Sequence, residues 1–344
     1  MSSTYYVLYP RGVRTGGPEA LHELVHTMRG MGLDAYLVPT PGTEHSERVQ
    51  EYRRYSAPER PEILDEAGAA VIAPEVSWDL LKDVHHATRY LWWLSIDSAG
   101  PFKAQRQLER WERKSISYRG RLKRFLRVAK SVPDRIYLRG QGITHLVQSD
   151  FAGAYLARWL GMQTSIVSDF IRVDDLPQDA DFELSRHSRV AFNPTKGREA
   201  IQLVMDRAPK EIEWLALEGL SRAEMIEALQ SSAIYLDLGH HPGRDRIPRE
   251  AAMCGALTLV AARGAGAKYE DVPIPDEHKI ALRGNFAALL VTKLQESFED
   301  LESEVIKQDF YRQTIRKSEE QFGREVADVF VHRKLGRRTI DYLG

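Results

Sequence analysis

Short apolar runs alternate with amphipathic stretches along most of the chain. Apolar, largely β-branched runs predict strands at 5–9, 35–39, 69–73, 90–96, 144–148 and 165–168, and a second series at 190–192, 213–217, 234–238 and 257–261. Between many of them lie helical patterns, at 152–160, 197–207, 222–230 and 248–254. Because strand–helix alternation is typical of parallel sheets covered by helices, the pattern predicts an α/β fold.

A polar stretch at 176–186 separates the two series of strands. It contains a proline and lacks any sustained apolar period, as an inter-domain linker does. We therefore predict a Rossmann-like domain at 1–175, a linker at 176–186, a second Rossmann-like domain at 187–305 and a helical tail at 306–344.

Composition narrows the class of protein. The 344 residues are 43% hydrophobic and 28% charged, and 48 basic residues nearly balance 49 acidic ones. The net charge of -1 gives no global reason to expect a nucleic-acid partner. The lone Cys254 excludes an internal disulfide, and the sequence shows no signal peptide and no apolar run of about 18 residues. We expect a cytoplasmic protein.

The segment 234–255 carries the most chemistry. An apolar run leads into a loop and then a small-residue helix, and loops of this kind bind ligands in open α/β sheets. Arginine guanidinium groups are fixed forks of donors that suit phosphate, and a glutamate can accept two hydrogen bonds from a vicinal diol. Surface ion pairs around a helix start are the alternative. The polar residues concerned are His240, His241, Arg244, Asp245, Arg246, Arg249 and Glu250.

Residues 250–255, Glu-Ala-Ala-Met-Cys-Gly, resemble the Glu-Ala-Met-Ala-x-Gly helix of GT-B glycosyltransferases, in particular the family-4-like (group 1) enzymes. The resemblance implies two Rossmann-like domains facing across a cleft, the first for the acceptor and the second for a nucleotide-sugar donor. It also implies that the helical tail crosses back to the first domain. Glu250 would bind the ribose. The family's preceding glutamate falls at Pro242, which leaves His241, Asp245 or Arg246 to replace it.

Two turns add candidates for the donor. Gly16 and Gly17 lie between the first strand and its helix, where backbone N–H groups meet a positive helix end. In the turn at 192–197, the resemblance implies that Lys196 points at the donor diphosphate, and Asn193 could bond sugar or phosphate. Together with Arg244 and Arg246, Lys196 would neutralise the departing diphosphate. Tight-turn geometry alone is the alternative for both turns, and for Lys196 we favour binding of the donor.

The catalytic base is not singled out. Asp150 and Asp169 rank equally, since both follow strands of the first series, although Asp150 is also a helix-cap candidate. His241 is a third catalytic candidate, placed to hydrogen-bond the donor. No zinc-type spacing occurs, so we expect no metal and no cofactor beyond the donor substrate.

Residues 103–130 form a basic stretch with a possible apolar face at Leu122, Phe125, Leu126 and Ala129. Such a helix could contact anionic lipid at the inner face of the membrane or guide an anionic acceptor, or it could pack on its own core.

The prediction is a metal-independent, hexosyltransferase-like enzyme. It would move sugar from a nucleotide-diphosphate sugar to a glycan, lipid-linked or small acceptor, with retention of configuration, in polysaccharide biosynthesis. The alternatives are a sugar-nucleotide 2-epimerase of the same fold and a non-catalytic nucleotide-sugar binding protein.

Overall fold

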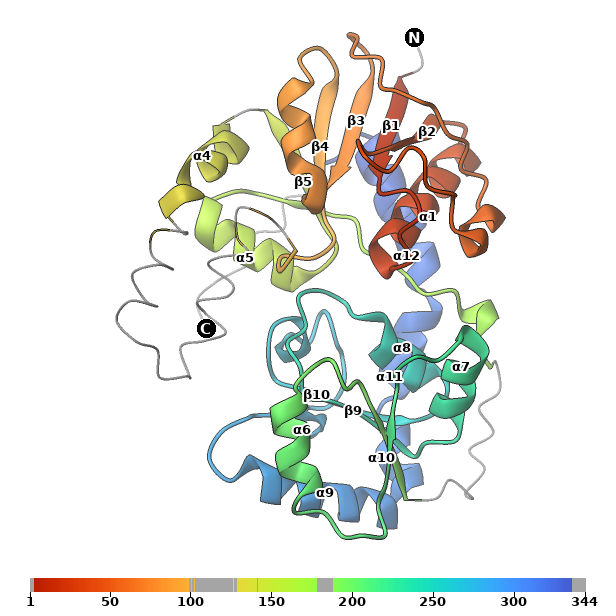
Figure 1. Cartoon of the computed structure of the whole chain (residues 1–344), viewed down its shortest axis with the longest axis vertical. Coiled ribbons are helices and arrows are strands. Elements are labelled where there is room, and N and C mark those ends of the chain that lie inside the picture. The colour runs from red at the N-terminus through yellow and green to blue at the C-terminus, as the bar shows by residue number, and fades with distance from the viewer. Residues whose placement is uncertain are drawn as a thin grey trace. The chain divides into compact units, whose positions relative to one another are not determined.

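A computed structural model describes residues 3–98, 100, 102, 126, 129–140, 142–177 and 188–335. The chain divides into two compact units (Figure 1). Unit 1 comprises Met1–Ser168 and Gln321–Gly344, and unit 2 comprises Asp169–Glu320. The sequence-based boundaries at 175/176 and 305/306 stay predictions, and residues 178–186 of the predicted linker lie outside the described residues.

Unit 1 contains a parallel sheet. In its described part the strand order is β2-β1-β3-β4-β5-β6, and every neighbouring pair is parallel. The strands are β1 (Thr4–Tyr9), β2 (Asp34–Pro39), β3 (Ala70–Pro74), β4 (Thr88–Trp93), β5 (Ile143–Val147) and β6 (Ser165–Ile166).

Helices cover both faces of this sheet because successive strand residues point to opposite sides. Trp93 packs in a core with Leu138 of α4 (Val132–Gly140) and Leu156 of α5 (Asp150–Leu160). The adjacent Trp92 stacks on Phe322 of α12 (Ser318–Val326), with ring centroids 6.3 Å apart. The other helical segments among the described residues of this unit are α1 (Gly16–Gly30), η1 (Gln50–Arg54), η2 (Glu75–Asp83) and η6 (Ala327–Val331).

Unit 2 contains a second parallel sheet, in the order β11-β10-β9-β7-β8 among its described strands. These are β7 (Arg189–Phe192), β8 (Glu213–Ala216), β9 (Ile234–Asp237), β10 (Leu257–Ala261) and β11 (Lys279–Ile280). The helices are α6 (Arg198–Met205), α7 (Arg222–Gln230), α8 (Arg246–Met253), α9 (Phe286–Glu299), α10 (Leu301–Ile306) and α11 (Asp309–Arg316), with short 3-10 turns η3 (Val173–Asp175), η4 (Ala265–Ala267) and η5 (Asp276–His278).

The predicted α/β class is confirmed, and each predicted strand is present with ends that move by no more than three residues. Helix α8 begins at Arg246, whereas the sequence pattern placed its start at Pro248. The prediction missed β11, which is only two residues long and so has no readable alternation. It also missed α4 as a separate helix.

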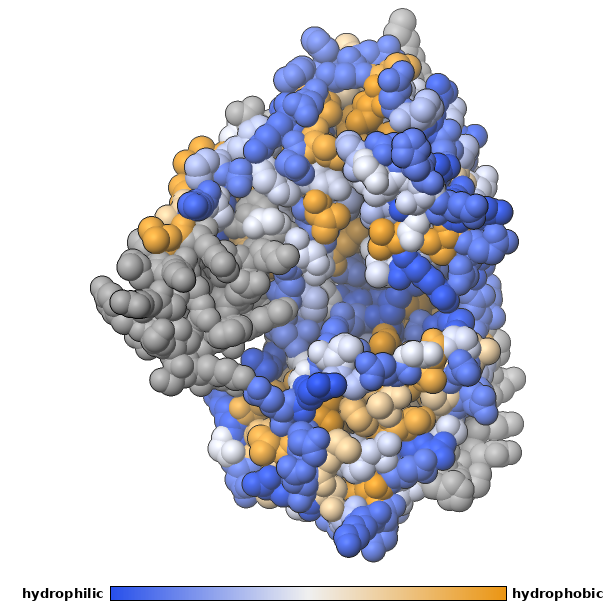
Figure 2. Space-filling model, viewed as in Figure 1, coloured by the Kyte–Doolittle hydropathy of each residue, from blue (hydrophilic) through white to orange (hydrophobic). Residues whose placement is uncertain are grey.

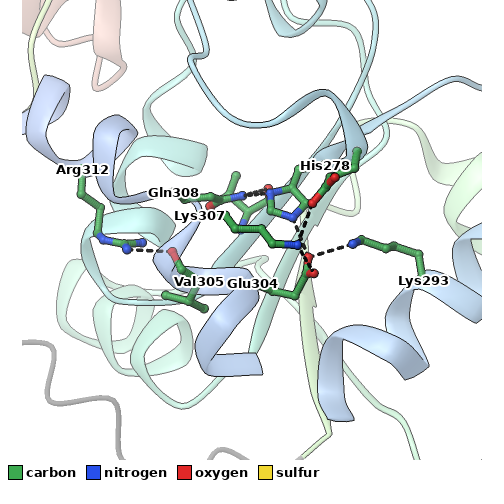
Figure 3. A network of polar contacts seen from close by, with 9 residues as sticks. His278, Lys293, Glu304, Val305, Lys307, Gln308 and Arg312 are labelled. Atoms are coloured by element: carbon green, nitrogen blue, oxygen red, sulfur yellow. Dashed lines mark hydrogen bonds and ion pairs between the residues drawn. The ribbon is translucent and has the colours of Figure 1, made fainter. Parts of the chain in front are cut away.

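A buried polar network joins η5, β10, α9 and α10 in unit 2 (Figure 3). The Gln308 amide group donates to His278 Nδ1 at 2.9 Å and to the Thr258 carbonyl at 2.8 Å. The Nε2 of His278 therefore carries the proton that faces Glu304 at 2.7 Å. Lys293 and Lys307 also bond the Glu304 carboxylate. Burial opposes ionisation of Glu304, but these partners outweigh it and lower its pKa to about 2.

The turn from β7 to α6 is pressed against the end of β9. Gly197 has φ +67°, and a Cβ at this position would lie 2.5 Å from the carbonyl carbon of Leu238. Glycine is therefore required here both for its backbone conformation and for its lack of a side chain.

We expect Gly197→Ala to lower the free energy of unfolding by about 3 kcal/mol or more, because left-handed strain and steric overlap add. Gly219→Ala is the matched control, since Gly219 has φ +69° and a Cβ there would meet nothing within 4 Å. That change should remove only about 1 kcal/mol. Urea unfolding measures both values, and equal losses would show that the close approach to Leu238 is unimportant.

Glu75 is a buried acid at the carboxyl end of β3. It is 3% exposed, and its Oε2 accepts a hydrogen bond from the backbone N–H of Leu94 at 2.9 Å. Burial raises the pKa of Glu75 to about 7, although the backbone donors favour the carboxylate.

This raised pKa predicts a pH-dependent stability. The folded state binds the proton more tightly than the unfolded state, so the contribution of Glu75 is complete below pH 4.5 and declines as pH rises to 7. The decline is about 3 kcal/mol, and Glu75→Gln should abolish it because the amide stays neutral. Unfolding monitored by tryptophan fluorescence at pH 5 and 7.5 measures the difference, and parallel pH profiles for the two proteins would refute this assignment.

Candidate functional site

The polar residues of the predicted site gather around the loop between β9 and α8, residues 238–245. Strand β9 lies between β7 and β10 in the sheet of unit 2. The loop therefore adjoins the carboxyl ends of both neighbouring strands, where open parallel sheets bind ligands. Glycines permit close packing here, because a Cβ on Gly239 would lie 2.6 Å from Cβ of Lys196.

A chain of four charged groups crosses this loop. The Nζ of Lys196 lies 2.6 Å from Oδ2 of Asp245, and Nδ1 of His241 lies 2.9 Å from the same oxygen. On the other side of the ring, Nε2 lies 3.8 Å from Oδ1 of Asp237. We call Lys196, Asp245, His241 and Asp237 the charge cluster. Its two carboxylates balance two potential cations.

The charge cluster favours a protonated imidazole. Burial works to lower the pKa of His241, but Asp245 and Asp237 outweigh it, and the pKa is raised from its usual value. Burial also disfavours the Asp245 carboxylate, yet His241 and Lys196 lower its pKa to about 2. The ring nitrogens of His241 lie near carboxylates on both sides, although neither nitrogen has a well-aligned hydrogen-bond acceptor among the described residues.

Donor atoms of Asp237, His241 and Asp245 lie within 4.8 Å of one another, as ligands of a metal ion do. A metal would need a neutral imidazole, whereas the raised pKa favours the charged form. Lys196 already bonds the Asp245 carboxylate, and Asp237 accepts from the Gly239 N–H at 2.9 Å. These contacts favour the ion-paired arrangement over a metal centre.

Glu250 lies in α8 with its carboxylate facing α7. Its Oε1 is 2.8 Å from Nη1 of Arg222, and its side chain is 8% exposed against 42% for Arg222. Arg222 opens α7, which begins with a capping box formed by Ser221 and Glu224. The sequence analysis missed Arg222 because nothing in its local sequence indicates a partner in another helix.

The three arginines of the loop and helix start lie in different environments. Arg244 is 7% exposed, and its Nε has no hydrogen-bond partner among the described residues. An unsatisfied buried donor is costly, and an anionic ligand would satisfy it. Arg246 is half-buried at the first position of α8. Arg249 is 1% exposed and bonds Asp169, with Nη2 2.6 Å from Oδ2.

The two aspartates ranked as catalytic bases lie in different units. Asp169 is 3% exposed and is held in the buried ion pair with Arg249, an arrangement that does not suit proton transfer with an acceptor. Asp150 is the first residue of α5 in unit 1, and the N-cap is Ser149, whose Oγ accepts from Ala152 N at 3.1 Å. Within unit 2, Asp169 is not a member of the charge cluster.

The two predicted turns differ from expectation in detail. Gly16 and Gly17 are the first two residues of α1, not a turn before it, and Thr15 makes no side-chain cap. The Oδ1 of Asn193 accepts from the backbone N and the Oγ1 of Thr195, at 3.0 and 2.7 Å. This local Asx turn explains Asn193 without a ligand.

Comparison with known proteins supports a fold assignment. No family model matches the sequence, and no curated protein matches it. Sucrose-phosphate synthase from Thermosynechococcus elongatus superposes with a TM-score of 0.66 at 12% identity, covering 96% of this chain and 99% of that one. Anabaena Alr3699/HepE, solved with UDP and glucose, gives 0.65 at 9% identity, covering 96% and 100%.

WaaG, a glycosyltransferase involved in lipopolysaccharide biosynthesis, gives a TM-score of 0.58 at 11% identity and covers 95% of this chain and 99% of its own. At such identities structural likeness establishes the fold, and function must be argued from the site. The two parallel sheets and the extent of these matches show that the chain has the two-domain α/β fold called GT-B, the fold that its sequence resemblance implied.

Proposed function

We propose that the protein is a glycosyltransferase that uses a nucleoside-diphosphate sugar. The observation that carries the proposal is the meeting of Glu250 with a concentration of cationic side chains around one loop of a GT-B fold. A diol-binding carboxylate and phosphate-binding cations are the two halves of nucleotide recognition.

In this proposal Glu250 accepts hydrogen bonds from the ribose hydroxyls. Arg222 orients the carboxylate, because its Nη1 pairs with one oxygen and leaves the other for the sugar. Arg222 then lies beside the nucleoside as well. A nearly buried carboxylate strengthens nucleotide binding several-fold only when its position is already fixed before the nucleotide binds.

Lys196, Arg244 and Arg246 bind the diphosphate and stabilise the negative charge that develops as it leaves. Lys196 is held in position by Asp245, whose own charge is balanced by His241. The cations take the place of a metal ion, and we propose that transfer is metal-independent.

We further propose transfer of a hexose with retention of configuration. The anomeric carbon–oxygen bond to the diphosphate breaks, the acceptor oxygen bonds the same carbon, and the hydroxyl proton leaves with the diphosphate. Retention is supported by two ion pairs, that of Asp245 with Lys196 and that of Glu250 with Arg222. Because cations hold both carboxylates, these residues are suited to binding the donor and not to acting as a general base. HepE, solved with UDP and glucose, supports a hexosyl donor.

The proposed acceptor is a glycan or a lipid-linked saccharide in polysaccharide biosynthesis, and the proposed location is the cytoplasm, at the inner face of the membrane. Most of the basic segment 103–130 lies outside the described residues. Apolar side chains within and just after this segment are exposed, with Leu126 at 52%, Val132 at 45% and Ile136 at 66%. Figure 2 shows hydrophobic groups among the hydrophilic ones on the surface. In the described parts of the chain no helix has the length and apolar character to cross a bilayer.

Nucleotide binding provides the first test. Glu250→Ala should weaken the binding of UDP, or of whichever of UDP, GDP and ADP the native protein prefers, by about tenfold to a hundredfold in calorimetry. That range corresponds to one or two hydrogen bonds to a charged group. Glu213→Ala is the control, because Glu213 pairs with Arg189 at the amino ends of β8 and β7 and should leave affinity unchanged.

Unchanged affinity in Glu250→Ala would remove Glu250 from the site.

NMR of the preferred nucleotide sugar then distinguishes the three candidate activities. Sugar transfer to an added glycan acceptor is the expected result. Epimerisation of the donor alone would indicate a 2-epimerase, and tight binding without turnover would indicate a nucleotide-sugar binding protein.

A further inference from the structure

The guanidinium group of Arg249 links the loop between β9 and α8 to a part of the chain that is distant in sequence. We call this loop, residues 238–245, the ligand loop. Arg249 lies in α8 immediately before Glu250 and is buried. On one side, its Nη2 donates to the carbonyl of Arg244 at 2.7 Å and its Nε to that of Asp245 at 3.2 Å. On the other side, its Nη2 and Nη1 bond the carboxylate and the carbonyl of Asp169, at 2.6 and 3.3 Å.

Asp169 lies at the boundary between the two units, because it is the first residue of unit 2. The residue before it, Ser168, closes the first segment of unit 1, where its N–H and Oγ both donate to Glu325 at 2.7 and 2.6 Å. Consecutive residues are thus anchored in different units. We call residues 169–176 the crossing segment.

The crossing segment is built into the core of unit 2. Ile171 and Leu176 are buried in one apolar cluster with Tyr311 and Ile315 of α11 and with α8 residues such as Ala251. The Tyr311 hydroxyl in turn lies in the electrostatic field of Arg249, Arg244, Asp245 and Asp169. Loop, helix start and crossing segment therefore form one continuous packed region.

We propose that Arg249 is a positioning residue that couples nucleotide binding at the β9–α8 loop to the order of the crossing segment. The inference rests on the proposed function. By holding two successive carbonyl groups, Arg249 fixes the loop backbone and thereby aims the side chains of Arg244 and Asp245. A ligand that orders this loop also favours the guanidinium position that bonds Asp169.

The coupling is reciprocal, because two sites that bias one shared element must bias each other equally. It depends on the planar fork of arginine. A lysine keeps the positive charge but presents a single ammonium, which cannot bond acceptors on both sides of the helix start in the same geometry.

Hydrogen exchange tests the coupling, with the nucleoside diphosphate preferred by the native protein as the probe at saturation. In the native protein, the nucleotide should slow exchange about fivefold or more in peptides covering 167–176 as well as in those covering 239–245. In Arg249→Lys and Asp169→Asn, peptides covering 239–245 should still be protected at saturation, whereas those covering 167–176 should not. The affinity of both variants should fall about tenfold.

Arg312→Lys is the matched control. Arg312 is a buried arginine of α11 that bonds the Val305 carbonyl at 2.7 Å (Figure 3) and pairs with Asp309. This variant should retain both the native affinity and the protection of 167–176. Asp169→Asn serves as the second variant because it keeps the size of the side chain if Arg249→Lys fails to fold.

Three results would overturn the proposal. The protection of 167–176 could persist in Arg249→Lys, or it could disappear equally in Arg312→Lys, which would indicate general loosening. A native protein that binds nucleotide without any protection of 167–176 also refutes the coupling but leaves the proposed function standing. If the native protein binds no nucleoside diphosphate, both fall.

Discussion

The carboxyl end of the sheet in unit 2 depends on one constraint, which is that each buried charge needs an opposite charge beside it. Removing a carboxylate or an ammonium from water costs several kcal/mol unless a partner and further hydrogen bonds compensate it. Lys196 and Arg249 each pair with a carboxylate from another segment of the chain, Asp245 and Asp169, and His241 shares Asp245 within its own loop. Each pairing therefore also fixes the backbone that carries it, so the loops at the ends of β7 and β9 are held by the same contacts that neutralise their charges.

This pairing of charges determines which groups are left to attract an anionic ligand. In the charge cluster the carboxylates of Asp237 and Asp245 already balance Lys196 and His241. A diphosphate thus meets a nearly neutral group there, and its attraction must come from other donors. Arg244 is the main candidate, because its guanidinium is buried and its Nε lacks a described partner. Lys196 can still contribute, since an ammonium has two further protons to donate after it has bonded Asp245.

The sequence was sufficient to predict every described strand except β11, and the helix that carries Glu250. Runs such as 234–236 are apolar on both faces, a pattern that packing inside a parallel sheet favours. Helix α8 could be found because Glu250 opens a short motif of small residues. These features depend on residues that are close together in the chain, so the apolar periodicity and the motif spacing are enough to predict them.

The pairing of charges could not be predicted in the same way. Arg222 and Glu250 belong to different helices, and Asp169 meets Arg249 across 80 positions of sequence. Which strand ends adjoin is set by the order β10-β9-β7, and a single sequence does not encode that order in any local pattern. Asp169 therefore looked like a base at a strand end, although its carboxylate belongs to a buried ion pair.

His241 shows how such pairing changes the role of a residue. The sequence favoured direct contact with the donor, but the ring is enclosed. A Cβ on Gly266 would lie 3.0 Å from Cδ2 of His241, and Gly264 packs on the backbone of His241. With both ring nitrogens facing carboxylates, the imidazole can influence a ligand only through Asp245 and, beyond it, Lys196. Its charge sets how strongly Asp245 retains Lys196, and hence how much of the lysine's positive charge is available to a phosphate group.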